Sequence, residues 1–90
     1  MRFALMCKDK PDHLDVRKAN REAHLAYIRR TGVVEMAGPL LDAGGAMVGS
    51  LIVLDCDDLT AAQAWADADP YAKAGLFDVV TLSAWNKVIG

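Results

Sequence analysis

Short apolar runs alternate along the chain with segments whose apolar side chains recur at helical spacing. Apolar runs that end at charged residues or glycines are typical of strands, whereas apolar residues three and four positions apart are typical of helices. The pattern predicts four strands, two helices and one helical turn, in this order: a strand over 2–7, a helix over 13–30, strands over 33–41 and 47–54, a helix over 60–68, a helical turn over 70–75 and a strand over 79–84.

Residues that favour helix ends and turns support these boundaries. Asp12 is in position to cap the first helix with its side chain, and Gly32 is the kind of residue that ends one. The segment 42–45, Asp-Ala-Gly-Gly, is typical of a hairpin turn, because glycines adopt the positive φ that such turns require. Asp57 or Asp58 is predicted to cap the second helix.

The predicted element order is β-α-β-β-α-β, within a single domain that spans residues 1–90. This is the order of the ferredoxin-like α+β sandwich, in which both helices cover one face of a four-stranded sheet. The segment 50–54 is almost continuously apolar, which indicates a strand that is buried on both faces. Since the helices cover only one face, we expect a second copy of the chain to cover the other, so that a homodimer forms.

The size, charge and cysteines of the chain narrow the class of protein to which it belongs. A chain of 90 residues buries only a little over ~60% of its unfolded surface by itself, which again favours a dimer. Ten Lys and Arg against 12 Asp and Glu give a net charge of −2, so we expect no nucleic-acid partner. The first apolar run ends at the charged segment 8–10 and is too short for a membrane span or a signal-peptide core. Cys7 and Cys56 lie in no CxxC motif, and we interpret both as reduced thiols of a cytoplasmic protein.

The first predicted helix carries a polar strip between two apolar strips. Its members, spaced i, i+3, i+4 and i+7 on one face, are Arg17, Asn20, Arg21 and His24. The apolar strips on either side are formed by Val16, Ala19, Ala23, Ala26 and Tyr27, and by Leu14, Leu25 and Ile28. Two interpretations are open: the polar strip is the solvated face of the helix, or it lines a pocket where cationic side chains meet an anionic or oxygen-rich ligand.

His24 is the best candidate for proton transfer, because an imidazole both gives and takes protons near neutral pH; the alternative is a surface or structural histidine. Asp69 has two interpretations, since an Asp before Pro70 is a good helix cap and a carboxylate is also a good partner for an imidazole. His13 lies 11 residues before His24, or about 16 Å along a helix, so the two cannot share a metal ion. No other spacing suggests a zinc site, and we expect no metal or cofactor.

Two further segments are open to a similar choice between a functional and a structural role. Gly38-Pro39 and Gly49-Ser50 either form part of a pocket wall or mark a strand end and a close-packing site. Cys56 has no His near it in the sequence that would activate a thiol, so we expect no cysteine nucleophile.

These segments together resemble the YciI (YCII-related) family, and the resemblance covers nearly the whole chain. The motifs that carry it are Arg21-x-x-His24-Leu25-x-Tyr27-Ile28, Gly32, Ala37-Gly38-Pro39-Leu40, Gly49-Ser50, Asp69-Pro70-Tyr71 and Gly75-Leu76-Phe77. The resemblance implies a ferredoxin-like fold and dimers of the dimeric α+β barrel type. It also implies a cleft that holds a His–Asp pair, here His24 and Asp69. The positions that match the surroundings of that cleft are Arg21, Gly38, Pro39 and Ser50.

The family includes a dehydrochlorinase of a chlorinated hydroxyquinol, and its fold is shared with muconolactone isomerase. The resemblance therefore implies cofactor-free acid–base chemistry, of the lyase or isomerase type, on a small oxygenated cyclic substrate. His24 would move the proton, Asp69 would orient His24, and Arg21 or the Ser50 hydroxyl would stabilise developing negative charge. Two alternatives stay open: a non-catalytic small-molecule-binding protein that uses the same cleft, and a cofactor-independent monooxygenase of the same architecture.

Overall fold

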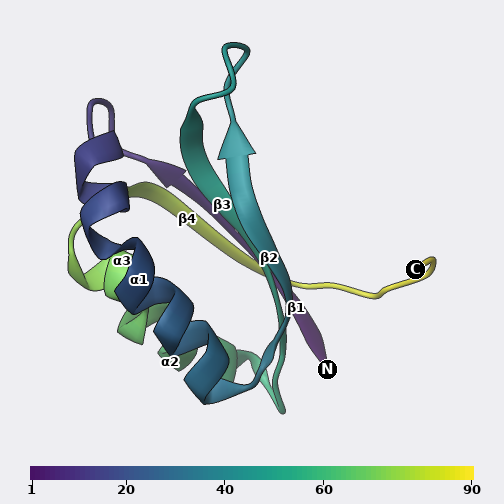
Figure 1. Cartoon of the computed structure of the whole chain (residues 1–90). Coiled ribbons are helices and arrows are strands. Elements are labelled where there is room, and N and C mark those ends of the chain that lie inside the picture. Colours follow the sequence, from purple (N-terminus) through teal and green to yellow (C-terminus); the bar gives the residue numbers. More distant parts are fainter.

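The chain folds into a four-stranded antiparallel sheet with all of its helices on one face (Figure 1). The computed structural model describes residues 1–90. Its elements are β1 (Arg2–Asp9), α1 (Leu14–Thr31), β2 (Val34–Leu41), β3 (Met47–Asp55), α2 (Leu59–Ala68), α3 (Pro70–Lys73) and β4 (Phe77–Ala84). The strand order β2-β3-β1-β4 and the helix layer confirm the predicted ferredoxin-like α+β fold.

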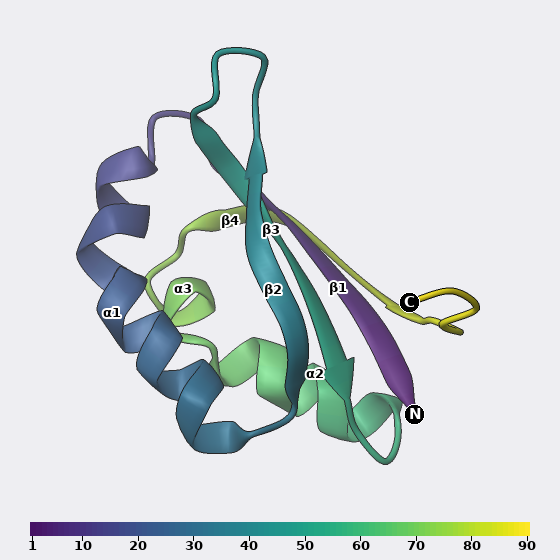
Figure 2. The same ribbon diagram turned by 45° about the vertical axis from the view of Figure 1, so that its right-hand side comes forward.

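The hydrophobic core lies between the sheet and the helices (Figure 2). Strand side chains alternate between the two faces of a sheet, so every second residue of β1 and β3 points toward the helices. The core residues that they contribute are Phe3, Leu5, Cys7, Ile52 and Leu54. From the helix layer, Tyr27 and Trp65 pack on this surface with their ring centroids 4.8 Å apart.

The start of α1 differs from the prediction. Asp12 does not cap the helix: its φ is 59°, and the N-cap is His13, whose side chain makes no capping hydrogen bond. The chain turns sharply after Pro11, which places the Asp12 side chain outside the cap position. The other end signals are confirmed, because Gly32 ends α1 with a φ of 68° and the Asp58 carboxylate accepts a hydrogen bond from the Ala61 N–H as the N-cap of α2.

Two strands extend further than the sequence pattern predicts. β1 continues through Lys8 to Asp9, and β4 already begins at Phe77, where the two strands pair. Asp9 lies on the same side of β1 as Leu5 and Cys7, so its carboxylate points under α1 rather than into solvent. A charged residue is tolerated there because Arg17 of α1 pairs with it.

The opposite face of the sheet is uncovered in this chain (Figure 1). Met6, Met36 and Val79, which the strand register places on that face, are 46%, 51% and 52% exposed. No helix has the length and apolar character that crossing a membrane requires.

Candidate active site

The polar strip of α1 lies partly inside the protein. Arg17 and His24 are only 3% and 6% exposed, whereas Arg21 between them is exposed at the rim of a cavity. The alanines of the neighbouring strip, Ala19, Ala23 and Ala26, face solvent instead. Of the two interpretations of this strip, the pocket-lining one therefore describes Arg17 and His24, and α1 turns its small apolar side chains outward.

Arg17 is held by a bidentate ion pair. Its Nε lies 2.7 Å from Oδ2 of Asp9 and its Nη2 lies 2.9 Å from Oδ1, and Nη2 also donates to the Ser50 hydroxyl at 2.9 Å. Burial works against the charge of Arg17, but the hydrogen bonds and the charge of Asp9 outweigh it, so the pKa of Arg17 is raised. Arg17 is therefore a permanent cation whose donors already serve the protein.

His24 and Asp69 form a buried hydrogen-bonded pair. Nδ1 of His24 lies 2.7 Å from Oδ1 of Asp69, which is 1% exposed. The same Oδ1 accepts the backbone N–H of Tyr71 at 3.0 Å and so caps α3. Asp69 thus both caps α3 and contacts His24. Because an ionised carboxylate only accepts hydrogen bonds, Nδ1 carries the proton and Nε2 of a neutral His24 is free to take one.

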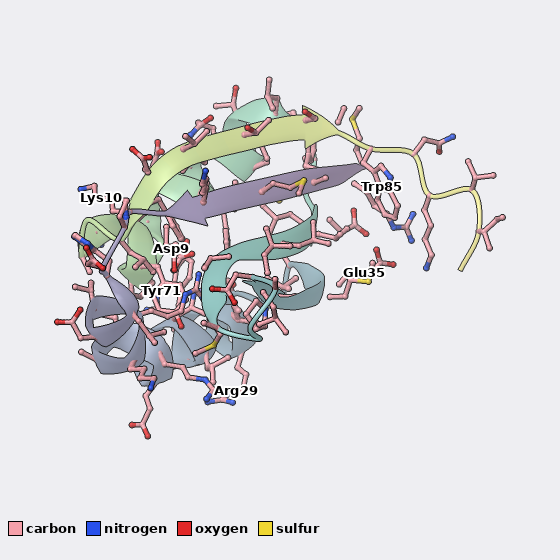
Figure 3. The ribbon with its side chains drawn as sticks, turned by 90° about the horizontal axis from the view of Figure 1, so that it is seen from above. Asp9, Lys10, Arg29, Glu35, Tyr71 and Trp85 are labelled. Carbon is pink, nitrogen blue, oxygen red and sulfur yellow. The ribbon has the colours of Figure 1, made fainter.

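Tyr71 connects the two charged pairs. Its ring stacks on His24 with a centroid distance of 4.0 Å and an interplanar angle of 16°, and the Arg17 guanidinium carbon lies 4.8 Å from the ring centroid. Figure 3 shows Tyr71 beside Asp9, between the sheet and α1. Burial raises the pKa of Tyr71, and the nearby charges of Arg17 and Arg21 offset part of this effect. The phenol is therefore protonated at neutral pH.

A cavity of about 180 Å³ opens beside these groups. Its polar lining consists of Arg17, Arg21, His24, Ser50 and Tyr71, and its apolar lining includes Leu25, Ile28, Ala37, Met47 and Ile52. β2 adds Gly38 and Pro39, and Pro39 is the strand partner of Ser50. The cavity lining thus combines polar and cationic groups with apolar ones.

The structure brings the predicted site residues to one place. Arg21, His24, Gly38, Pro39 and Ser50 all line the cavity. Asp69 does not line it and instead supports His24 from behind. Neither Gly38 nor Ser50 could be assigned to the cavity from local sequence alone, because β2 and β3 approach α1 only in the folded sheet.

Sequence reasoning missed two residues, Asp9 and Tyr71. A signal existed for Asp9, since it continues the period-2 series of Phe3, Leu5 and Cys7 on the core side of β1. No local signal predicted that the Tyr71 ring would contact His24, because that contact joins α3 to α1.

Cys7, the cysteine nearest the two charged pairs, has a thiol that resists deprotonation. Burial raises the pKa of the Cys7 thiol to about 12, and the charges of Asp69 and Asp9 add to this effect. Cys7 is therefore a neutral thiol at physiological pH. No three His, Cys, Asp or Glu side chains gather closely enough to hold a metal ion.

The chain has relatives along its whole length. The YCII-related domain matches residues 1–86. The chain belongs to the YCII-related family. It is 38% identical over 97 residues to Protein YciI of Escherichia coli, in an alignment that covers 98% of this chain and 99% of that relative.

Solved structures with this fold include an enzyme of the size of this chain. The 5-chloro-2-hydroxyhydroquinone dehydrochlorinase of Burkholderia phenoliruptrix, in complex with 2,5-dihydroxybenzoquinone, superposes with a TM-score of 0.89 at 33% identity. That superposition covers 96% of the YCII-related chain and 94% of the dehydrochlorinase. An antibiotic biosynthesis monooxygenase shares the fold alone, with a TM-score of 0.61, 10% identity and 98% of each chain covered.

Proposed function

We propose that this protein is an acid–base enzyme, of the lyase or isomerase type, that acts on a small oxygenated ring compound. The observation that carries the proposal is the buried hydrogen bond between Nδ1 of His24 and Oδ1 of Asp69, at 2.7 Å. It fixes the imidazole in one tautomer and leaves Nε2 as the nitrogen that exchanges a proton at the cavity. The carboxylate stabilises the imidazolium that forms when His24 takes a proton.

The cavity favours a substrate with a single ring. Its volume of about 180 Å³ is close to the roughly 150 Å³ of an apolar protein cavity that holds benzene. Since Arg17 is paired with Asp9, the exposed Arg21 is the cation available to an anionic oxygen of the ligand. The similarity to a dehydrochlorinase solved with a dihydroxybenzoquinone supports this class of compound.

In the elimination that we propose, Nε2 of His24 takes the proton of a ring hydroxyl, the electron pair of the O–H bond forms a C=O bond, and the ring electron pair that it displaces takes the proton back from His24 at the carbon that carries the halogen. Nε2 then takes the proton of a second ring hydroxyl, whose electron pair forms a second C=O bond, and the ring electron pair that it displaces expels the halide with the electrons of the carbon–halogen bond. His24 passes this second proton to solvent, so that one hydrogen halide is lost in total and a quinone remains. Arg21 and the Ser50 hydroxyl, whose oxygen is already held by Arg17, stabilise the negative charge that develops.

Chloride release from 5-chloro-2-hydroxyhydroquinone tests the proposal. We expect His24→Ala to lower kcat by about 10²- to 10⁴-fold, the typical contribution of a general acid or base. His13→Ala is the matched control, because His13 precedes the same helix and its ring is hydrogen-bonded to the Pro11 carbonyl rather than to a carboxylate. Undiminished turnover by His24→Ala would overturn the proposal. Tight binding of 2,5-dihydroxybenzoquinone with no turnover of any hydroxylated ring compound would instead favour a non-catalytic binding protein.

We also propose that the uncovered sheet face pairs with a second copy of the chain. Met6, Met36 and Val79 form an apolar surface on this face that water would otherwise contact. Light scattering after size exclusion should give the mass of a dimer for the wild type and of a monomer for Met6→Lys. Leu59→Lys is the control, because Leu59 is a similarly exposed residue of α2, in the helix layer. A monomeric wild type would contradict this proposal.

A further inference from the structure

The Tyr71 hydroxyl lacks a hydrogen-bond acceptor within the protein. Tyr71 is 2% exposed and lines the cavity, and the hydrogen bond that it donates to Asp69 comes from its backbone N–H. The other tyrosine, Tyr27, is also buried, but its hydroxyl donates to the Trp65 carbonyl at 2.9 Å. The one buried side-chain oxygen or nitrogen without a hydrogen-bond partner is Oδ2 of Asp69, so the Tyr71 hydroxyl is not closed off in the same way. Because Tyr71 lines the cavity, an acceptor for its hydroxyl is able to approach from there.

The Tyr71 ring is fixed from several sides. His24 stacks on its face, the Arg17 guanidinium lies 4.8 Å from its centroid, and Phe77 meets it edge-on at 6.1 Å with an interplanar angle of 83°. The Asp69 cap fixes the backbone at the same residue. The hydroxyl thus has a set direction before any ligand binds, which is what a preorganised hydrogen-bond donor requires.

The charges around Tyr71 suit an anionic acceptor. Arg17 and Arg21 both act on the phenol, and the pKa of Tyr71 is nevertheless raised because burial dominates. The phenol therefore keeps its proton at neutral pH and donates it in a hydrogen bond. A ligand oxygen that carries negative charge would accept this bond beside two guanidinium groups.

We propose that Tyr71 is a further catalytic residue, whose hydroxyl donates a hydrogen bond to the substrate oxygen that His24 deprotonates. This inference rests on the proposed function. The proton of the substrate hydroxyl goes to Nε2 of His24, the negative charge develops on the oxygen until its electron pair moves into the ring, and Tyr71 keeps its own proton throughout. Both residues line the cavity and their rings stack, so the proposal requires one substrate oxygen to lie beside both groups.

The test compares Tyr71→Phe with the matched control Tyr27→Phe. Tyr71→Phe keeps the ring that contacts His24 and Arg17 and removes only the hydroxyl, and Tyr27→Phe removes a buried hydroxyl away from the cavity. Calorimetry with 2,5-dihydroxybenzoquinone should show about 10- to 100-fold weaker binding for Tyr71→Phe, the range expected for a lost hydrogen bond to a charged group. The kcat for chloride release should fall by about 10²-fold. Tyr27→Phe should change neither quantity.

The two readouts separate this inference from the proposed function. Wild-type affinity and kcat in Tyr71→Phe, together with a loss of turnover in His24→Ala, would overturn the role of Tyr71 alone. If the wild type released no chloride, the acid–base proposal would fail, and the affinity of Tyr71→Phe for the quinone would still decide whether the hydroxyl binds the ligand oxygen. A wild type that did not bind the quinone would overturn both.

Discussion

Oδ1 of Asp69 lies 2.7 Å from Nδ1 of His24, although 45 residues separate the two in the sequence. The same oxygen caps α3 through the Tyr71 N–H, so one buried atom ties a helix start to a titratable ring. The second oxygen of Asp69, Oδ2, is buried without a hydrogen-bond partner. The hydrogen bonds that stabilise the negative charge of this carboxylate therefore come from His24 and from the start of α3.

Asp69→Asn should separate the capping role from the pairing role. Asn is as good an N-cap as Asp, so we expect α3 to stay folded. The neutral amide no longer stabilises an imidazolium, and kcat should fall by about 10²- to 10⁴-fold. The ¹⁵N chemical shifts of the His24 ring should show that the proton no longer resides on Nδ1 alone. The His13 ring serves as an internal reference, and an unchanged His24 tautomer would contradict the pairing.

Breaking the buried Asp9–Arg17 pair should lower the free energy of unfolding far more than breaking a surface ion pair. Asp9→Asn leaves a buried cation without a counter-charge, and we expect it to lower the free energy of unfolding by about 3–5 kcal/mol. Arg17→Met should cost a similar amount, and the double variant should cost less than the sum of the two. Glu35→Gln is the control, because its pair with Arg2 is partly exposed and should contribute about 0–1 kcal/mol. Urea denaturation measures the free energy of unfolding of all four variants. If the double variant lost as much as the sum of the two single variants, the coupling between Asp9 and Arg17 would be refuted.

Gly49 should tolerate no side chain. A Cβ at this position would collide with the carbonyl oxygen of Cys7 on the neighbouring strand. We expect Gly49→Ala to lower the free energy of unfolding by about 1–3 kcal/mol, the usual cost of overpacking. Gly38→Ala is the matched control, since nothing lies within 4 Å of a Cβ there. Equal thermal stability of the two variants would show that β1 and β3 can move apart at no cost.

The Cys7 thiol should resist alkylation until the pH is high. Its pKa of about 12 means that the reactive thiolate is scarce at pH 8. In a Cys56→Ala variant, which leaves Cys7 as the single thiol, the rate of reaction with iodoacetamide should therefore keep rising with pH beyond pH 9. The raised pKa also means that the folded state holds a proton that the unfolded state loses above about pH 9, so Cys7 stabilises the fold less as pH increases. A rate that levels off below pH 9 would contradict the raised pKa.

The sequence by itself determined the elements and their order. Apolar periodicity and local end signals, such as Gly32 after α1 and Asp69 before Pro70, depend on neighbours in the chain and are readable from it. The same is true of His24 and Asp69 as candidates, because the resemblance to a family rests on motifs in the chain. The Asp12 cap failed because several residues near a helix start are able to cap it, and only the path of the chain selects one.

Tertiary structure alone decided which polar residues would be buried together. The helix pattern of α1 left open whether Arg17 and His24 face solvent, because helical spacing places residues on a common face without stating what that face meets. The sheet supplies Asp9 and Ser50 to Arg17, the N-cap of α3 supplies Asp69 to His24, and α3 supplies Tyr71 to the cavity. A buried cation is stable only where partners from distant segments converge on it, and that convergence arises only when the helices pack on the sheet.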